Sequence, residues 1–149
     1  MENKGLVIVH TGDGKGKTTA ALGMAMRAWG NHLRVLILQF IKGSWKYGEL
    51  ESIKTLASVH NHIEIRQGGL GFSQRGSGAE EEHRCAAAEL LQTAMAELQS
   101  NAWDMIILDE FNYAYSFGFI PLDDLEQLLS VRPEKTHLIF TGRNAAQEL

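Results

Sequence analysis

The stretch that decides the fold of this chain is Thr11–Thr19, which has the sequence TGDGKGKTT. It follows Gly5–His10, a continuously apolar and β-branched run that predicts a strand buried on both faces of a parallel sheet. It precedes Thr18–Trp29, whose Ala, Leu and Met content predicts a helix, and Gly30 supplies a stop signal. A strand, a glycine-rich turn and a helix are therefore expected in that order.

The rest of the chain continues this alternation. Further strands are predicted at Leu33–Phe40, Ile63–Arg66, Met105–Leu108 and Thr136–Thr141. Further helices are predicted at Glu49–Ala57, Ala79–Ser100 and Leu122–Leu129. Residues 67–78 contain five glycines and predict a long loop. The pattern indicates an α/β fold with a mostly parallel sheet and no linker between domains.

The composition is that of one ordinary globular domain. The chain has 149 residues, of which 44% are hydrophobic and 21% charged, enough to build a sizeable core. A net charge of −4 argues against a protein that coats nucleic acid. The single cysteine, Cys85, cannot form an internal disulfide, which fits a reducing compartment. No run approaches the length of a membrane span. We therefore expect a cytoplasmic protein with no nucleic-acid or membrane partner.

The glycine-rich segment has the chemistry of a phosphate-binding loop. Its backbone N–H groups can converge on anionic oxygens, and the following helix adds the positive end of its dipole. Lys17 brings a mobile positive charge, and the Thr18 hydroxyl can ligate Mg²⁺. The standard pattern G-x-x-x-x-G-K-[ST] requires glycine at position 11, where this chain has Thr11 and places Gly12 next. The segment still predicts ATP binding with Mg²⁺, because the strand before it and the helix after it are in place.

Two further features follow predicted strands. Asp109 and Glu110 end the strand Met105–Leu108, a pattern that delivers a carboxylate to a Mg²⁺ site. Adjacent residues point to opposite sides of a strand, so only one of the two is expected to face the metal directly. Arg143 follows the last strand, where ligands bind in open α/β sheets, and its guanidinium can grip phosphate. A solvated surface arginine is equally compatible with this position.

Aromatic residues also leave a predicted strand, in Gln39–Trp45. Phe40 and Trp45 can line a pocket for a flat ligand, although packing in the core or at a rim is favoured on composition alone. The sequence contains no recognisable catalytic triad or cluster of metal-binding cysteines. Any chemistry is therefore expected to depend on positioning and charge stabilisation rather than on a protein nucleophile.

Taken together, these residues resemble the P-loop type of ATP:corrinoid adenosyltransferases, also called cob(I)alamin adenosyltransferases. The matching segments run in the family's order over nearly the whole chain, and the shifted glycine is itself the family's version of the loop. They are Thr11–Ala21, Gln39–Trp45, Gly71–Phe72, Leu108–Glu110, Leu122 after Pro121, Arg132–Pro133 and Thr141–Arg143. The resemblance implies a three-layer, RecA-like P-loop fold.

The resemblance also implies a reaction. Enzymes of this family transfer the 5′-deoxyadenosyl group of ATP to the Co(I) of a corrinoid and release triphosphate, in adenosylcobalamin synthesis or salvage. ATP lies in the loop in the reverse of the usual sense, so that its C5′ faces the cobalt. Since Co(I) is the nucleophile, the protein needs none of its own. The family further implies a homodimer and an electron-donating flavoprotein reductase as partner.

Residue roles carry over from the family by position. The implied catalytic residues are Lys17, Glu110, Arg143 and Phe72, and the implied Mg²⁺ ligands are Thr18 and Glu110 with Asp109 in support. The implied nucleotide- and corrinoid-side residues are Gly12, Asp13, Gly14, Lys15, Gly16, Lys17, Thr18, Thr19, Arg27 and Trp45. Phe72 matches an aromatic residue that helps to displace the lower axial base of the corrinoid, which makes the cobalt easier to reduce.

The chain departs from the family's pattern in several places. Gln74 stands where members often have a second aromatic residue, so displacement of the lower base is expected to be weaker or to use Trp45. Asp13 replaces an asparagine of some members and adds negative charge beside the phosphates. We expect residues 1–149 to form a single domain without the family's N-terminal extension, final strand and tail.

Two other functions remain compatible with the sequence. One is a conventional P-loop NTPase or kinase that acts at the γ-phosphate. The other is a non-catalytic module that binds ATP or a corrinoid, which the short C-terminus and Gln74 favour. The products separate the three: triphosphate for the adenosyltransferase, ADP and phosphate for the NTPase, and none for the module.

Overall fold

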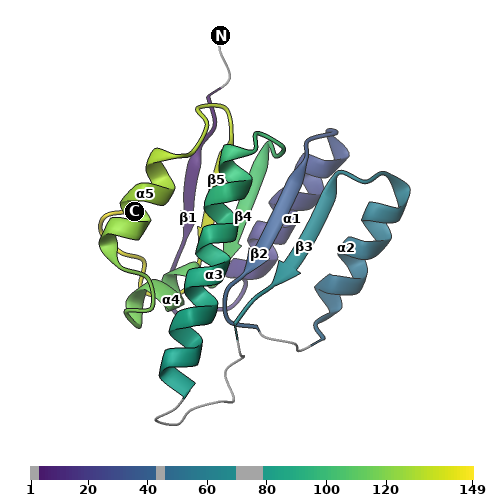
Figure 1. The fold of residues 1–149 in the computed structure, drawn as a ribbon. Helices are drawn as coiled ribbons and strands as arrows, with labels where there is room; N and C mark the ends of the chain where they lie inside the picture. The colour runs from purple at the N-terminus through teal and green to yellow at the C-terminus, as the bar shows by residue number, and fades with distance from the viewer. Residues whose placement is uncertain (1–3, 43–45, 70–78) are drawn as a thin grey trace.

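The computed structural model describes residues 4–42, 46–69 and 79–149. Five parallel strands form one sheet in the order β1-β5-β4-β2-β3 (Figure 1). The strands are β1 (Val7–His10), β2 (Val35–Gln39), β3 (Ile63–Gln67), β4 (Met105–Asp109) and β5 (His137–Thr141). The helices are α1 (Lys17–Gly30), α2 (Gly48–Val59), α3 (Ala79–Gln99), α4 (Phe111–Ser116) and α5 (Leu122–Ser130). The predicted α/β fold with a parallel sheet is confirmed.

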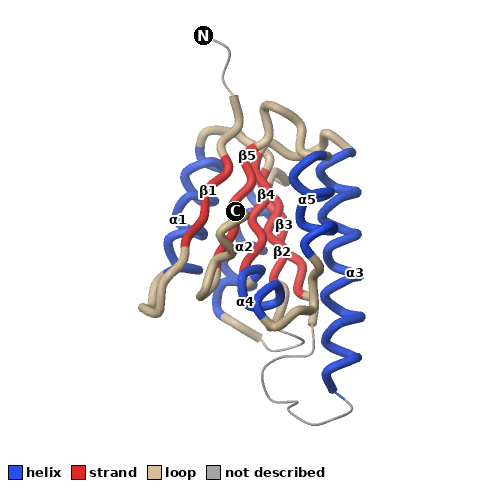
Figure 2. The backbone as a smooth tube through the Cα atoms, turned by 90° about the vertical axis from the view of Figure 1, so that its left-hand side faces the viewer, coloured by secondary structure: helices blue, strands red, loops and turns tan. Residues whose placement is uncertain are grey.

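Helices cover both faces of the sheet and make three layers (Figure 2). α1 and α2 pack on one face, and α3, α4 and α5 pack on the other. Strand β4 contributes side chains to both helix layers, because successive side chains of a strand point to opposite faces. Ile107 belongs to the cluster under α1, whereas Ile106 and Leu108 belong to the cluster under α3. A continuously apolar strand is therefore what a sheet covered on both faces requires.

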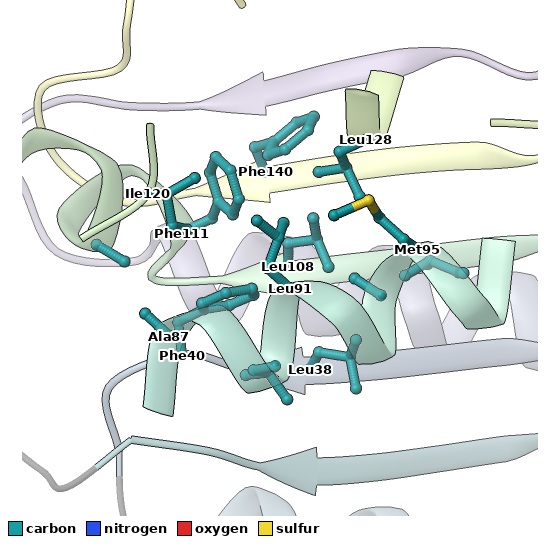
Figure 3. Packing of buried hydrophobic residues seen from close by; sticks show 14 of the residues in the cluster. Leu38, Phe40, Ala87, Leu91, Met95, Leu108, Phe111, Ile120, Leu128 and Phe140 are labelled. Carbon is teal, nitrogen blue, oxygen red and sulfur yellow. The ribbon is translucent and has the colours of Figure 1, made fainter. Parts of the chain in front are cut away.

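The larger core cluster joins the sheet to α3, α4 and α5 (Figure 3). Phe111, the first residue of α4, is fully buried between two other phenylalanines. Its ring meets those of Phe40 and Phe140 edge-on, with centroids 5.3 Å and 4.9 Å apart. Edge-to-face contacts are the favoured geometry for aromatic pairs. Phe40 thus packs in the core, as predicted from the composition of its segment. The burial of Phe111 also anchors α4 at the carboxyl end of β4.

The prediction that the first strand is buried on both faces is met only in part, because Ile8 and Val9 are half-buried against the clusters on opposite faces whereas the start of the strand is exposed. β1 is parallel, but it lies at the edge of the sheet and pairs only with β5 in the described part of the chain. Leu6 and Val7 are 57% and 39% exposed. An apolar, β-branched run fits an edge strand as well as a central one, so its composition alone does not distinguish the two.

Helix α4 was not predicted from the sequence. It has six residues, FNYAYS, of which three are aromatic, and such a short segment carries no readable period. Most of the predicted glycine-rich loop, residues 70–78, lies outside the described residues. Within the described ranges, none of the helices combines the length and the apolar content needed to cross a membrane.

Candidate active site

Each of the five strands ends in a polar residue, and these residues form a row across one edge of the sheet. Strand pairing places His10 beside Thr141 and Gln39 between Asp109 and Gln67. Leu108 pairs with Phe140, so that Asp109 lies next to Thr141. The row sits at the carboxyl ends of the strands, the edge at which open α/β sheets bind ligands.

Asp109 is the centre of this row. It is 1% exposed, and both of its carboxylate oxygens are occupied. Oδ1 accepts hydrogen bonds from the hydroxyls of Thr18, at 2.8 Å, and Thr141, at 2.7 Å. Oδ2 accepts a hydrogen bond from Nε2 of Gln39 at 3.1 Å and lies 3.0 Å from Nζ of Lys42. Asp109 thus ties the start of α1 to three neighbouring strand ends rather than facing open space.

Lys42 balances the buried charge of Asp109. The residue is 8% exposed, and its ammonium also donates to Oε1 of Glu49 at 2.8 Å. Burial acts to lower the pKa of Lys42, but Asp109 and Glu49 outweigh it and the pKa is raised. Neither Lys42 nor Glu49 was singled out from the sequence. No clear signal in the sequence marks either residue, because Lys42 follows the apolar pair Phe40–Ile41 and its partner Asp109 is far away in the chain.

The phosphate loop leads directly into α1. Gly16 caps the helix with φ +104°, a left-handed conformation that favours glycine. The first turn of α1 has no acidic residue and no side-chain cap, so its N–H groups remain free for an anion. The ammonium of Lys17 donates to the carbonyls of Gly12, at 2.6 Å, and Gly14, at 2.7 Å, and so braces the loop from within.

Glu110 is the second residue of the acidic pair and faces differently. Its backbone is left-handed, with φ +60°, which is uncommon for a residue with a side chain. The Glu110 N–H donates to the hydroxyl of Thr141 at 3.0 Å, which holds this conformation. Burial, and then the charge of Asp109, raise the pKa of Glu110, although Lys42, Lys17 and Arg143 oppose the shift. Its carboxyl group therefore has cations nearby but is not locked in an ion pair of the described residues.

A pocket of about 490 Å³ lies where these elements meet. Its lining combines the phosphate loop, the start of α1 and the segments after β4 and β5. The lining residues are Gly14, Lys15, Gly16, Lys17, Thr18, Thr19, Glu110, Tyr113 and Arg143. Three cationic side chains and the amino end of a helix thus surround one space, with a single carboxylate among them. Such a site suits a polyanion such as a nucleotide polyphosphate.

The structure brings together most of the residues expected from the sequence. Gly12 and the exposed Asp13 belong to the same loop without being among the pocket's lining residues. Tyr113, the third residue of α4, lines the pocket and was missed; its ring stacks on Phe117 with centroids 4.1 Å apart. Its signal was weak, an aromatic residue three positions after Glu110 in a helix that was not foreseen.

Arg27 does not reach the pocket. It is exposed in the last turn of α1, about 15 Å along the helix axis from Lys17. The pocket lies at the first turn of that helix, so Arg27 is not among the residues that line it. Phe72, Gln74 and Trp45, which the resemblance assigns to the corrinoid side, lie outside the described residues.

Comparison with known sequences identifies the family of this chain. The sequence model of the ATP:corrinoid adenosyltransferases BtuR/CobO/CobP matches residues 3–149. The chain belongs to the ATP:corrinoid adenosyltransferase family. It is 36% identical over 149 residues to the corrinoid adenosyltransferase of Escherichia coli (strain K12), a match that covers the whole chain and 73% of that protein.

Other members of the family give similar values. The corrinoid adenosyltransferase CobA of Salmonella typhimurium is 35% identical over the whole chain and 73% of its own length. The corrinoid adenosyltransferase of Pseudomonas aeruginosa is 32% identical over 97% of the chain and 69% of its own length. Among solved structures, a KaiC-like protein of Pyrococcus horikoshii superposes with a TM-score of 0.48 at 15% identity, over 93% of this chain and 62% of that one.

Proposed function

We propose that this chain transfers the 5′-deoxyadenosyl group of ATP to the Co(I) of a corrinoid and releases triphosphate. Membership of the family supports the reaction, and the pocket supports the part that the protein must perform. The observation that carries the proposal is the lining of the pocket. It gathers cations and helix N–H groups for a polyphosphate, and it offers no Ser, Cys or His side chain among its described residues to act as a nucleophile.

The reaction needs no such nucleophile. The electron pair of Co(I) forms the Co–C5′ bond while the C5′–O5′ bond breaks, and the electrons of that bond leave with the triphosphate. Cobalt becomes formally Co(III), and no proton has to move. Negative charge grows on the leaving triphosphate, so catalysis depends on stabilising it. Lys17, Arg143 and the first turn of α1 line the space where that charge develops.

The residues present fit a Mg²⁺ ion bound together with the triphosphate. The Thr18 hydroxyl donates its proton to Asp109, so its lone pairs are free for a metal. Glu110 lines the same pocket and supplies a second hard oxygen donor. The described residues contain no cluster of three or more acidic, His or Cys ligands, which suits a metal held mainly by phosphates and water.

Thr18 and Glu110 would therefore hold Mg²⁺, and Asp109 would act through Thr18. When bound, the ion neutralises part of the charge on the leaving triphosphate. Asp109 keeps the Thr18 hydroxyl turned so that its lone pairs face the pocket, and Lys42 forms an ion pair with the other carboxylate oxygen of Asp109.

The corrinoid side of the proposal rests on the family resemblance. Phe72 would help to displace the lower axial base, so Phe72→Ala should reduce the rate more when the reaction starts from Co(II) and a reductase than from prereduced Co(I). Equal losses from both starting states would remove this role. A flavoprotein reductase as electron donor and a homodimeric assembly are part of the same proposal.

Product analysis tests the proposed reaction. Prereduced Co(I) corrinoid is mixed with the protein and MgATP in the absence of oxygen, and products are followed by visible absorption and ³¹P NMR. We expect one triphosphate for each Co–C bond formed, and neither product with the Lys17→Ala variant. ADP and phosphate without a Co–C product would replace the proposal by a γ-phosphate NTPase. ATP binding with no product at all would leave a non-catalytic module.

A further inference from the structure

The backbone around Arg143 is shaped by contacts from elsewhere in the chain. Its two neighbours are both left-handed, Gly142 with φ +129° and Asn144 with φ +52°. Such a segment has no repeating local hydrogen bonds that would hold it in place. The direction in which Arg143 leaves the chain must therefore be set by the groups that bind the backbone on either side of it.

Gly142 is held on both sides of its peptide unit. Its N–H donates to the carbonyl of His10 at 3.2 Å, and its carbonyl accepts from Nδ2 of Asn112 at 3.0 Å. Asn112 is fully buried at the start of α4. A Cβ at position 142 would lie 2.9 Å from the Cβ of Asn112, so the close approach requires glycine.

Thr11 supplies the third attachment. Its hydroxyl accepts a hydrogen bond from the Ala145 N–H at 3.1 Å, across 134 residues of sequence. Position 11 is the one where the standard phosphate-loop pattern has its first glycine. A glycine there has no oxygen beyond its backbone carbonyl to offer. The departure of this chain from the standard pattern thus creates a direct link between the phosphate loop and the segment that bears Arg143.

We propose that Thr11 and Asn112 are positioning residues that hold Arg143 against the polyphosphate bound by the loop. The three hydrogen bonds bracket Arg143, two at Gly142 and one at Ala145. They connect the segment that bears Arg143 to β1, to the phosphate loop and to α4. The two segments that bring cations to the pocket are therefore joined to each other directly. A long arginine side chain held at its base loses less freedom when it grips an anion, which strengthens binding. The proposal rests on the proposed function only in taking triphosphate as that anion.

Thr11 offers the cleaner test because it is exposed. Thr11→Val keeps the shape and removes the acceptor, whereas Thr11→Ser keeps it. The affinity for MgATP and for inorganic triphosphate is measured by calorimetry in each variant. One hydrogen bond contributes about 1 kcal/mol, so we expect Thr11→Val to weaken binding about fivefold and Thr11→Ser to bind within about twofold of the parent. Thr55→Val, the same change at an exposed threonine of α2, is the control and should bind as the parent does.

A double-mutant cycle separates positioning from a general structural effect. If Thr11 acts through Arg143, Thr11→Val has no further effect on triphosphate affinity once Arg143→Ala is present. An equal loss in both backgrounds, or no loss in the parent, would overturn the proposal. The readout is binding, so it stands even if no adenosylated product forms, and the two proposals can fail separately.

Asn112 provides the second variant. Asn112→Asp keeps the volume and removes the donor to the Gly142 carbonyl. Where thermal unfolding shows the variant to be folded, we expect kcat with prereduced Co(I) corrinoid to fall more than KM for ATP rises, because the arginine acts on a charge that grows in the transition state. A change in KM alone would contradict this part. An unfolded Asn112→Asp variant leaves the decision to the Thr11 cycle.

Discussion

The pocket has two cationic arms, the phosphate loop with Lys17 and the segment after β5 with Arg143, and they are held in place in opposite ways. On the phosphate loop, Lys17 is braced by carbonyls three and five residues before it in the sequence. On the segment after β5, Arg143 is placed by hydrogen bonds that span 30 and 134 residues. The first arm is a local structure that a short peptide pattern describes. The second exists only once β1, β5 and α4 have come together.

The difference predicts how each arm fails. Damage to the phosphate loop removes the nucleotide site itself, whereas damage around Arg143 leaves the site but loosens one of its contacts. Replacements in the two arms should therefore differ in magnitude and in kind, and they should be distinguishable by whether ATP still binds.

The largest effect is expected from Lys17→Ala. It removes the mobile charge and the internal brace of the loop at Gly12 and Gly14. We expect the rate with prereduced Co(I) corrinoid to fall by about 10³-fold or more, at the upper end of what one charge-stabilising group contributes. Lys54→Ala, at an exposed lysine of α2, is the charge-matched control. Retained activity in Lys17→Ala would show that this segment is not the phosphate-binding loop.

Arg143→Ala is expected to have the next largest effect, about 10²-fold on kcat/KM, with ATP binding weakened but still measurable. Arg143→Lys should recover only part of the loss, because a lysine cannot make the bidentate contact. The matched control is Arg27→Ala, at the far end of α1, which we expect to stay within about twofold of the parent. Comparable losses at Arg27 and Arg143 would show that the pocket has been placed wrongly.

Glu110→Gln should lower activity and raise stability. The pKa of Glu110 is raised above its usual 4.5 by burial and by Asp109, so the folded protein keeps this proton to higher pH than the unfolded chain. The folded state therefore loses stability as pH rises from 4.5 through the raised pKa, and glutamine escapes that loss. Thermal unfolding should show the variant more stable than the parent at pH 7 and equal to it at acid pH. A variant less stable than the parent at pH 7 would contradict this environment for Glu110.

The smallest effect on activity is expected from Thr141→Val, which sharpens the comparison between the two arms. It removes the acceptor of the Glu110 N–H and a donor to Asp109. A buried hydrogen bond left unmade costs about 1–3 kcal/mol of stability, and we expect about a tenfold loss of rate as well. Thr136→Val is the control, a buried threonine just before β5 that donates to the Trp103 carbonyl. Thr136→Val should lose a similar amount of stability and keep its activity. If both variants lost activity equally, the effect of Thr141→Val on activity would be a consequence of lost stability alone.

The sequence predicted the fold wherever a regular pattern covers many residues. All five strands, the long helix α3 and the loop before Lys17 follow from apolar runs, helix formers and glycine spacing. The same reasoning overestimated the burial of Gly5–His10, because burial of a strand depends on which neighbours it acquires. It also missed α4, which is too short to show a period and is fixed by the burial of Phe111 between Phe40 and Phe140.

The site could be predicted only in part for the same reason. Lys17, Thr18 and the acidic pair belong to short patterns with their own chemistry. Lys42, Asn112 and Tyr113 have no such pattern; their positions follow from contacts with residues far away in the sequence. Asp109 shows where prediction from the sequence ends. The sequence indicates a carboxylate near the metal, but only the structure places both of its oxygens in contact with protein groups.

The central claim is that the pocket holds triphosphate as a leaving group, so that the bond broken is the one at C5′. The reaction of prereduced Co(I) corrinoid with MgATP labelled with ¹³C at C5′, followed by ¹³C and ³¹P NMR, tests it most directly. We expect the labelled carbon to lose its oxygen and appear bound to cobalt, together with intact triphosphate. A label that remains a phosphoester in ADP, with phosphate released, would contradict the account.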